Sequence, residues 1–309
     1  MCIRDSPHQR AAYYEQVGAR AHLLSMVKQH HGKELSFNNL LDLDSARGMA
    51  RDFEVPCCAI VKHNNPCGVA LGDNGLDAYE RARDCDPMSA YGGVIAINQP
   101  VDVALAESLH KNFVEVLIAP SYEDGALEVL QQKEAIRIFT DQASPFPDPR
   151  EKDIKRVRGG ILVQDRDGEP EQREMMEVVT KTQPSEESWN DMLFAWTVCR
   201  HVRSNAIILA KDGVTLGIGA GQMSRVDSTR LAIEKCRDAH GDEAADLLTG
   251  CAMASDAFFP FADGPAAAIE AGATSVIQPG GSKRDGEVIE ACDDSETAMV
   301  FTKHRHFRH

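Results

Sequence analysis

The sequence predicts an α/β protein, because segments with helical periodicity alternate with short apolar runs along most of the chain. The apolar run at residues 57–61 has the length and composition of a buried strand. Residues 189–202 gather tryptophan, methionine and leucine on one helical face. Residues 206–210 and 214–219 are apolar runs joined by a Lys-Asp-Gly turn, which is typical of a β-hairpin.

The remaining elements follow the same alternation. In the first part of the chain we expect helices at residues 11–29, 38–53, 75–84, 103–112 and 126–132, and strands at 94–97, 114–119, 136–139 and 159–164. In the second part we expect helices at residues 228–239, 265–271 and 285–291, and strands at 250–254, 275–278 and 298–301. The polar segment 165–187 divides two lobes, residues 7–175 and 185–309, whose loose similarity indicates an internal duplication.

Length and composition set further bounds. A chain of 309 residues suggests about two domains. The net charge of −15 argues against nucleic acid and anionic membranes as partners. We expect no membrane span and no signal peptide. The nine cysteines form no CxxC pair, which predicts reduced thiols in a cytoplasmic protein, with Cys57 and Cys58 on opposite faces of their strand.

The most suggestive chemistry lies where the first strand ends, at Lys62 and His63. Histidine titrates near neutral pH and can exchange a proton, and lysine can stabilise an oxyanion. Asn64, Asn65, Pro66 and Gly68 are expected to break regular structure after the pair. Strand ends are usually polar, so the local pattern alone favours an ordinary strand end.

Two glycine-rich turns follow apolar runs in the second lobe. Residues 217–222 read Gly-Ile-Gly-Ala-Gly-Gln, which departs from a dinucleotide fingerprint at Gln222 and follows a hairpin strand. We expect this turn to bring the backbone close to a ligand, with Arg225 beside it for an anion. Residues 279–283 form a second strand-to-helix turn of this kind.

Two further segments could bind a ligand. The loop at residues 255–263 has three phenylalanines, which could cover a planar ring or plug the core. The basic C-terminal tail, residues 303–309, could clamp an anion or fray in solvent, and Phe307 favours docking. The His30-His31 pair is expected to be solvated at a helix end. We find no catalytic triad, no carboxylate pair and no metal cluster in the sequence.

Four of these segments together resemble one known family. Residues 61–68, 217–225, 254–263 and 278–282 are similar, in order, to the C-terminal half of the bifunctional purine biosynthesis proteins, the AICAR transformylase portion. The resemblance covers residues 7–309 and implies two tandem cytidine deaminase-like α/β lobes without zinc. It also implies that the N-terminal IMP cyclohydrolase domain is absent and that residues 1–6 are a truncation remnant.

The resemblance implies formyl transfer from 10-formyltetrahydrofolate to the 5-amino group of AICAR, in a homodimer with sites at the interface. His63 matches the proton acceptor, Lys62 its neighbouring lysine, and Asn205 an orienting asparagine. Glu115 stands where many members have aspartate. The matching substrate positions are Met88, Tyr91, Gly92, Glu115, Arg225, Phe258 and Arg305, and the folate-side positions are Val226, Asp263, Ser282 and Lys283.

Other functions remain open. One alternative is a truncated, catalytically impaired fragment that still binds nucleotide, and another is a regulatory module that keeps the pocket without catalysis. The presence of Lys62, His63, Asn205 and Arg225 argues against the regulatory module. The sequence lacks the ligand residues of a zinc deaminase. A dehydrogenase is also excluded, because Gln222 replaces the third glycine of the dinucleotide-binding fingerprint.

Overall fold

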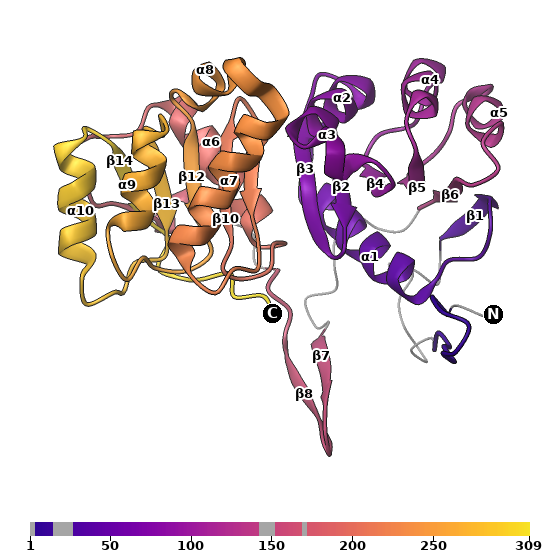
Figure 1. Cartoon of the computed structure of the whole chain (residues 1–309), viewed down its shortest axis with the longest axis horizontal. Helices are drawn as coiled ribbons and strands as arrows, with labels where there is room; N and C mark the ends of the chain where they lie inside the picture. Colours follow the sequence, from indigo (N-terminus) through magenta and orange to yellow (C-terminus); the bar gives the residue numbers. More distant parts are fainter. Residues whose placement is uncertain (1–3, 15–26, 142–151, 169–171) are drawn as a thin grey trace.

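A twelve-stranded mixed sheet runs through the molecule, with helices on both faces (Figure 1). The computed structural model describes residues 4–14, 27–141, 152–168 and 172–309. The strands lie in the order β1-β6-β5-β4-β2-β3-β11-β10-β12-β13-β14-β9. The predicted α/β class is therefore confirmed.

The first half of the sheet is built by residues 28–140. Three of its helices begin after a polar N-cap residue. The side chains of Ser36, Asn74 and Asp102 each accept a hydrogen bond from the backbone N–H three residues further on. The elements are β1 (Lys28–His31), α1 (Phe37–Arg51), β2 (Cys57–Lys62), β3 (Asn65–Leu71), α2 (Gly75–Cys85), α3 (Pro87–Ala90), β4 (Gly93–Ile97), α4 (Val103–Lys111), β5 (Val114–Ala119), α5 (Ala126–Gln131) and β6 (Arg137–Thr140).

The second half follows a projecting hairpin. Helix α7 begins three residues earlier than predicted, because Ser224 caps it by accepting the N–H of Asp227. The elements are β7 (Lys152–Val157), β8 (Gly160–Asp165), a 3-10 turn (Arg173–Met175), β9 (Glu177–Val178), α6 (Glu186–Cys199), β10 (Ile207–Lys211), β11 (Val214–Gly219), α7 (Arg225–His240), a 3-10 turn (Gly241–Glu243), α8 (Ala244–Leu248), β12 (Ala252–Ser255), α9 (Asp263–Glu270), β13 (Ser275–Gln278), α10 (Asp285–Asp294) and β14 (Ala298–Phe301).

The two halves repeat one topology. The order β6-β5-β4-β2-β3 in the first half corresponds to β14-β13-β12-β10-β11 in the second. The halves meet where β3 and β11 run antiparallel, with Ala70 opposite Val214. The Thr215 hydroxyl strengthens this seam by accepting the N–H of Val69 and donating to its carbonyl oxygen. The repeated order supports the internal duplication expected from the sequence.

The hydrophobic core has one shared layer and two separate ones. Helices α1 and α6 pack on one face of the sheet in a single buried cluster. On the other face, α2, α4 and α5 cover the first half, and α7, α8, α9 and α10 cover the second. Cys57 lies in the shared cluster and Cys58 in the opposite one, which confirms that they face opposite ways.

Two equivalent glycines allow a helix to lie close on each side of the seam. A Cβ on Gly68 would overlap the carbonyl oxygen of Ala82 in α2, and a Cβ on Gly217 would overlap that of Ala232 in α7. Gly219 meets α7 at Ser228 in the same way. The prediction of a turn is therefore wrong for Gly217 and Gly219, which lie within β11 and pack against a helix.

The N-terminal region differs from the prediction. Residues 15–26 of the expected helix 11–29 lie outside the described residues, and residues 28–31 form β1, which pairs with β6. His30 and His31 are therefore not solvated at a helix end. His30 hydrogen-bonds Thr140 Oγ1 at 2.6 Å, and His31 hydrogen-bonds the carbonyl oxygen of Lys133 at 3.1 Å. A free edge of β6 favours this strand pairing over a helix.

Several other features bear on function. No helix in the described segments is long and apolar enough to cross a membrane. Those segments contain no group of three or more His, Cys, Asp or Glu that could hold a metal ion.

The eight cysteines of the described segments are free, and burial raises the thiol pKa of Cys85 to about 12. A thiol with so high a pKa is a poor nucleophile at neutral pH.

Candidate active site

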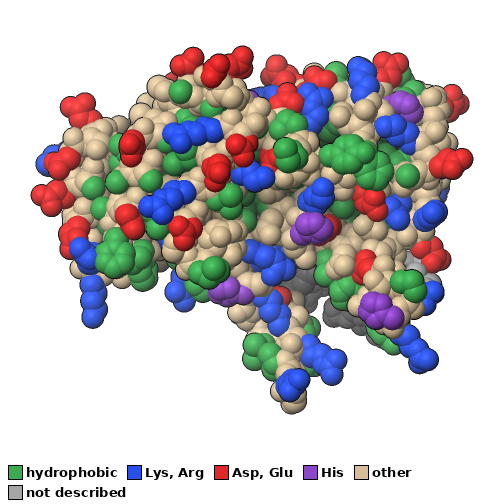
Figure 2. Space-filling model, in the orientation of Figure 1, with side chains coloured by type: hydrophobic (Ala, Val, Ile, Leu, Met, Phe, Trp, Pro, Cys, Tyr) green, Lys and Arg blue, Asp and Glu red, His purple; other side chains and the backbone are tan. Residues whose placement is uncertain are grey.

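One edge of the sheet gathers the chemistry that the sequence singled out. Strand directions place the end of β2, the starts of β3, β4, β5 and β10, and the ends of β11 to β14 at this edge. Figure 2 shows histidine, lysine and arginine side chains along the lower edge of the molecule, whereas acidic side chains crowd the upper edge. An edge of this kind suits an anionic small molecule despite the negative charge of the whole chain.

A cavity of about 190 Å3 lies at the seam between the halves. It is mixed in character, with two lysines, a histidine and an aspartate opposite an apolar wall. Its lining residues are Lys62, His63, Asn65, Pro66, Cys67, Cys85, Asp86, Ser89, Ile218, Ala220, Leu231 and Lys235. Of the predicted site residues, Lys62 and His63 line this cavity.

The His63-Asn64 loop is a tight connection between β2 and β3. Lys62 pairs with Asn65 across the hairpin, and the two loop residues have positive φ angles of 55° and 62°. This is the backbone of a type I′ turn. Asp42 in α1 accepts the backbone N–H of His63 at 3.2 Å and that of Asn64 at 2.7 Å. The prediction that regular structure breaks here is wrong, because the turn feeds directly into β3.

Lys62 is tied to the segment that follows α3. Its Nζ donates to the carbonyl oxygen of Tyr91 at 2.7 Å. Gly92 has a φ of 73° and donates its N–H to the carbonyl oxygen of Phe113. The antiparallel pairing of β2 with β4 therefore brings Tyr91 and Gly92 beside Lys62.

Asn205 and Arg225 meet on the second half of the site. Arg225 Nη2 donates to Asn205 Oδ1 at 2.8 Å, and Asn205 Nδ2 donates to the carbonyl oxygen of Gln222 at 2.8 Å. Arg225 also donates to the buried carboxylate of Asp256, and to Ser255 Oγ at 3.0 Å. Since Arg225 is 9% exposed, its guanidinium fixes the Asn205 amide from within the protein.

The two halves of the site are joined by further hydrogen bonds. Asn65 Oδ1 accepts the backbone N–H of Arg203 at 3.0 Å. Arg308 in the C-terminal tail donates to Ser45 Oγ at 3.1 Å, and Ser45 donates to Asn64 Oδ1 at 2.6 Å. The tail therefore docks as predicted, although the anchors are Arg308 and the buried His306, while Phe307 is 45% exposed.

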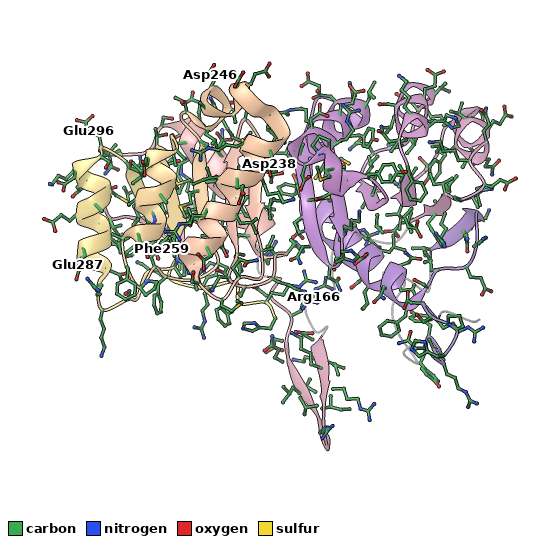
Figure 3. All side chains as sticks on the ribbon, viewed as in Figure 1. Arg166, Asp238, Asp246, Phe259, Glu287 and Glu296 are labelled. Carbon is green, nitrogen blue, oxygen red and sulfur yellow. The ribbon has the colours of Figure 1, made fainter. Side chains whose placement is uncertain are left out.

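The remaining predicted residues lie along the same edge but outside the cavity. Glu115 at the start of β5 forms an ion pair with Arg137 at 2.7 Å. Met88 is 84% exposed. In the phenylalanine loop, Phe259 is fully buried and fills the core, whereas Phe258 is 38% exposed at the surface. Figure 3 shows Phe259 within the second half. Val226, Asp263, Ser282, Lys283 and Arg305 follow the ends of β11 to β14.

Sequence reasoning missed several residues that shape this site. Asp42 holds the His63 loop, and Asp256 anchors Arg225. Asp86 and Lys235 form an ion pair across the cavity at 2.9 Å. Asp256 lies inside the segment 254–263 that carries the family resemblance, so the sequence did point to its position. Asp42 and Lys235 lie within amphipathic helices, where nothing local separates them from ordinary surface charges.

The fold and the site together define a two-half α/β protein with a cavity at its seam that is lined by two lysines, a histidine and an aspartate. The family model described as "AICARFT/IMPCHase bienzyme" matches residues 5–235. The chain belongs to this family.

Curated relatives match across the chain. The Bifunctional purine biosynthesis protein PurH of Cereibacter sphaeroides is 53% identical over 310 residues, covering 99% of this chain and 58% of the relative. The protein of the same name from Roseobacter denitrificans is 50% identical, with the same coverage. The chain thus spans somewhat more than half the length of the relatives it matches.

Proposed function

We propose that this chain transfers a formyl group from 10-formyltetrahydrofolate to the 5-amino group of AICAR, a step in purine biosynthesis. The observation that carries the proposal is that Lys62 and His63 line the seam cavity. Asn65, which follows them in the same hairpin, accepts the N–H of Arg203, two residues before Asn205. The names of the relatives and of the family agree with a purine biosynthesis role. The motifs named above favour the transformylase over the cyclohydrolase.

The chemistry demands such a site. The 5-amine of AICAR is conjugated with its carboxamide, so it is a weak nucleophile. His63 takes the proton from this amine as nitrogen attacks the formyl carbon, and the Lys62 ammonium stabilises the resulting oxyanion. The bond from the formyl carbon to N10 then breaks, and N10 takes the proton held by the His63 imidazolium, which returns His63 to its neutral form and releases tetrahydrofolate. Asn205, fixed by Arg225, orients the carboxamide.

The test is formyl transfer by the purified chain, followed by the appearance of tetrahydrofolate. Replacing His63 by alanine should lower kcat by about 10²- to 10⁴-fold, the usual contribution of a general base. Lys62→Ala should also be severely impaired. His240→Ala, at the end of α7, is the matched control and should retain activity. A His63→Ala variant that turns over normally would refute the proposal. AICAR binding without turnover in the wild type would instead favour an impaired nucleotide-binding fragment.

We further propose that the chain forms a homodimer through the β7–β8 hairpin, which projects from the body (Figure 1). An isolated two-stranded hairpin is marginal in water. This one exposes five apolar side chains by 42–64%: Ile154, Val157, Ile161, Leu162 and Val163. It also carries four cationic side chains, Lys152, Lys155, Arg156 and Arg158, in a chain of net charge −15. A second copy of the chain would cover the apolar side chains, and its net negative charge would attract the cationic ones.

The hairpin is also connected to the site. Lys155 Nζ donates to the C-terminal carbonyl oxygen of His309, and Asp167 accepts a hydrogen bond from His306 Nδ1 at 2.7 Å. His306 in turn donates its backbone N–H to the carbonyl oxygen of Asp256. Arg166 lies at the base of the hairpin, below the seam (Figure 3). A partner on the hairpin would therefore stiffen the tail that borders the site.

A further inference from the structure

Helix α3 is a single turn on the surface of the first half, and its residue Ala90 packs against the buried cluster there. None of its four residues is buried. Its flanking residue Tyr91 is 64% exposed and packs on Phe113 with ring centroids 5.3 Å apart. One turn of helix is too short to be stable alone. The Tyr91 carbonyl oxygen, which accepts a hydrogen bond from the Lys62 ammonium, directly follows this turn. Contacts with Phe113 hold it from one side, and contacts at the start of α3 hold it from the other.

Those contacts converge on Asp86, the residue that caps α3. The Asp86 carboxylate accepts the backbone N–H of Ser89 at 3.0 Å and its hydroxyl at 2.6 Å. The same carboxylate accepts a hydrogen bond from Lys235 Nζ at 2.9 Å. Burial raises the pKa of Asp86, but the hydrogen bonds from Ser89 and Lys235 outweigh it, and the net pKa is lowered. The hydrogen bond to Asp86 raises the pKa of Lys235. Both groups therefore stay charged at neutral pH.

Lys235 comes from the other half of the molecule. It lies on α7, whose first residue is Arg225, the partner of Asn205. Ten residues of helix separate Lys235 from Arg225, or about 15 Å. Asp238, one turn further along α7, lies where the helix faces the first half (Figure 3). The rigid helix thus connects the Asn205–Arg225 pair with the cap of α3.

We propose that the Lys235–Asp86 ion pair is a clamp between the halves that positions Lys62. By fixing α3 against α7, it holds the Tyr91 carbonyl oxygen where it can orient the Lys62 ammonium at the cavity. Lys235 and Asp86 are positioning residues, because they act through Tyr91. The pair is also partly shielded, since the side chain of Asp86 is only 12% exposed and that of Lys235 36%. The kinetic part of this inference rests on the proposed formyl transfer.

The first experiment is independent of activity. The rate at which an amine-acetylating ester labels Lys62 is measured by peptide mass spectrometry in the full chain. Lys235→Met removes the ammonium and keeps the aliphatic stem, and Lys235→Arg is the conservative rescue. We expect Lys62 to label severalfold faster in Lys235→Met and Asp86→Asn, and near the wild-type rate in Lys235→Arg. The matched control is Lys181→Met, because Lys181 forms an ion pair with Asp293 but its side chain is 88% exposed. Unchanged labelling in a folded Lys235→Met variant overturns the proposal.

The second experiment separates positioning from substrate contact. Loss of the clamp should lower kcat by about tenfold, because small misplacements at a reacting centre are costly. Lys235 and Asp86 line the cavity, but if they act through Tyr91 and not by binding substrate, the KM for AICAR should stay within about twofold. A large rise in KM with normal kcat would mean that Lys235 binds substrate directly, which overturns the clamp. If the wild type is inactive but Lys62 labelling shifts as expected, the proposed function fails and the clamp stands.

Discussion

The carboxylate of Asp42 accepts the backbone N–H of His63 at 3.2 Å, so a helix residue 21 positions earlier fixes the proposed proton acceptor. The same carboxylate accepts the N–H of Asn64, the second residue of the turn. Both turn residues have positive φ angles, which cost energy for a side-chain-bearing residue. Asp42 therefore stabilises a backbone that the loop would not hold alone.

Replacing Asp42 by alanine should uncouple the loop from α1. A hydrogen bond to a charged group contributes about 1.5 to 3 kcal/mol. Because Asp42 is only partly buried, the two bonds together should contribute no more than the lower end of that range for each, about 3 kcal/mol in total. We expect a lower melting temperature and a fall in formyl transfer larger than the fall in AICAR binding. Asp44→Ala is the control, since Asp44 is exposed on the same helix. Equal behaviour of the two variants would contradict this role.

The seam glycines give a prediction about stability. Alanine at Gly217 would place a methyl group against the carbonyl oxygen of Ala232, so β11 and α7 would have to separate. Overpacking of this kind costs about 1 to 3 kcal/mol. Gly68→Ala should behave alike at α2. Urea unfolding measures the loss, and Gly168→Ala, with no atom within 4 Å of its Cβ, should be nearly neutral.

The Asp86–Lys235 pair should show a defined pH dependence. The pKa of Asp86 is lowered in the folded state, so its stabilisation is fully present above about pH 4 and is lost as the pH falls below that. The pKa of Lys235 is raised, so its stabilisation is present below about pH 10 and is lost above it. A double-mutant cycle with Asp86→Asn and Lys235→Met should give about 1 kcal/mol of coupling at pH 7. Coupling that persists undiminished after acid has protonated Asp86 would exclude this ion pair as its source.

The hairpin prediction concerns assembly. Ile161→Ser combined with Val163→Ser should shift the chain from dimer to monomer in light scattering after size-exclusion chromatography, because it removes exposed apolar area from β8. Val103→Ser changes an exposed apolar residue of α4 and should leave the dimer intact. A wild-type chain that is monomeric at micromolar concentration would rule out the dimer.

Local patterns in the sequence predicted most of the fold and part of the site. The alternation of apolar runs and helical segments was sufficient for α1, β2, α2, β4 to β6 and β10 to β14, because buried strands and amphipathic helices leave a periodic signal. Strands β1, β3, β7 and β9 were missed. Each is polar, interrupted by proline or glycine, or very short, and forms because a partner strand offers unpaired backbone groups.

The sequence by itself determined the α/β class, the family and the identity of the Lys62-His63 pair, because these depend on residue types and their order. Only the tertiary structure decided what those residues contact. Asp42 reaches His63, Lys235 reaches Asp86, and Asp256 reaches Arg225 across 21, 149 and 31 residues of chain. Such pairings arise from strand direction and helix packing at the seam, and no local pattern in the sequence encodes them.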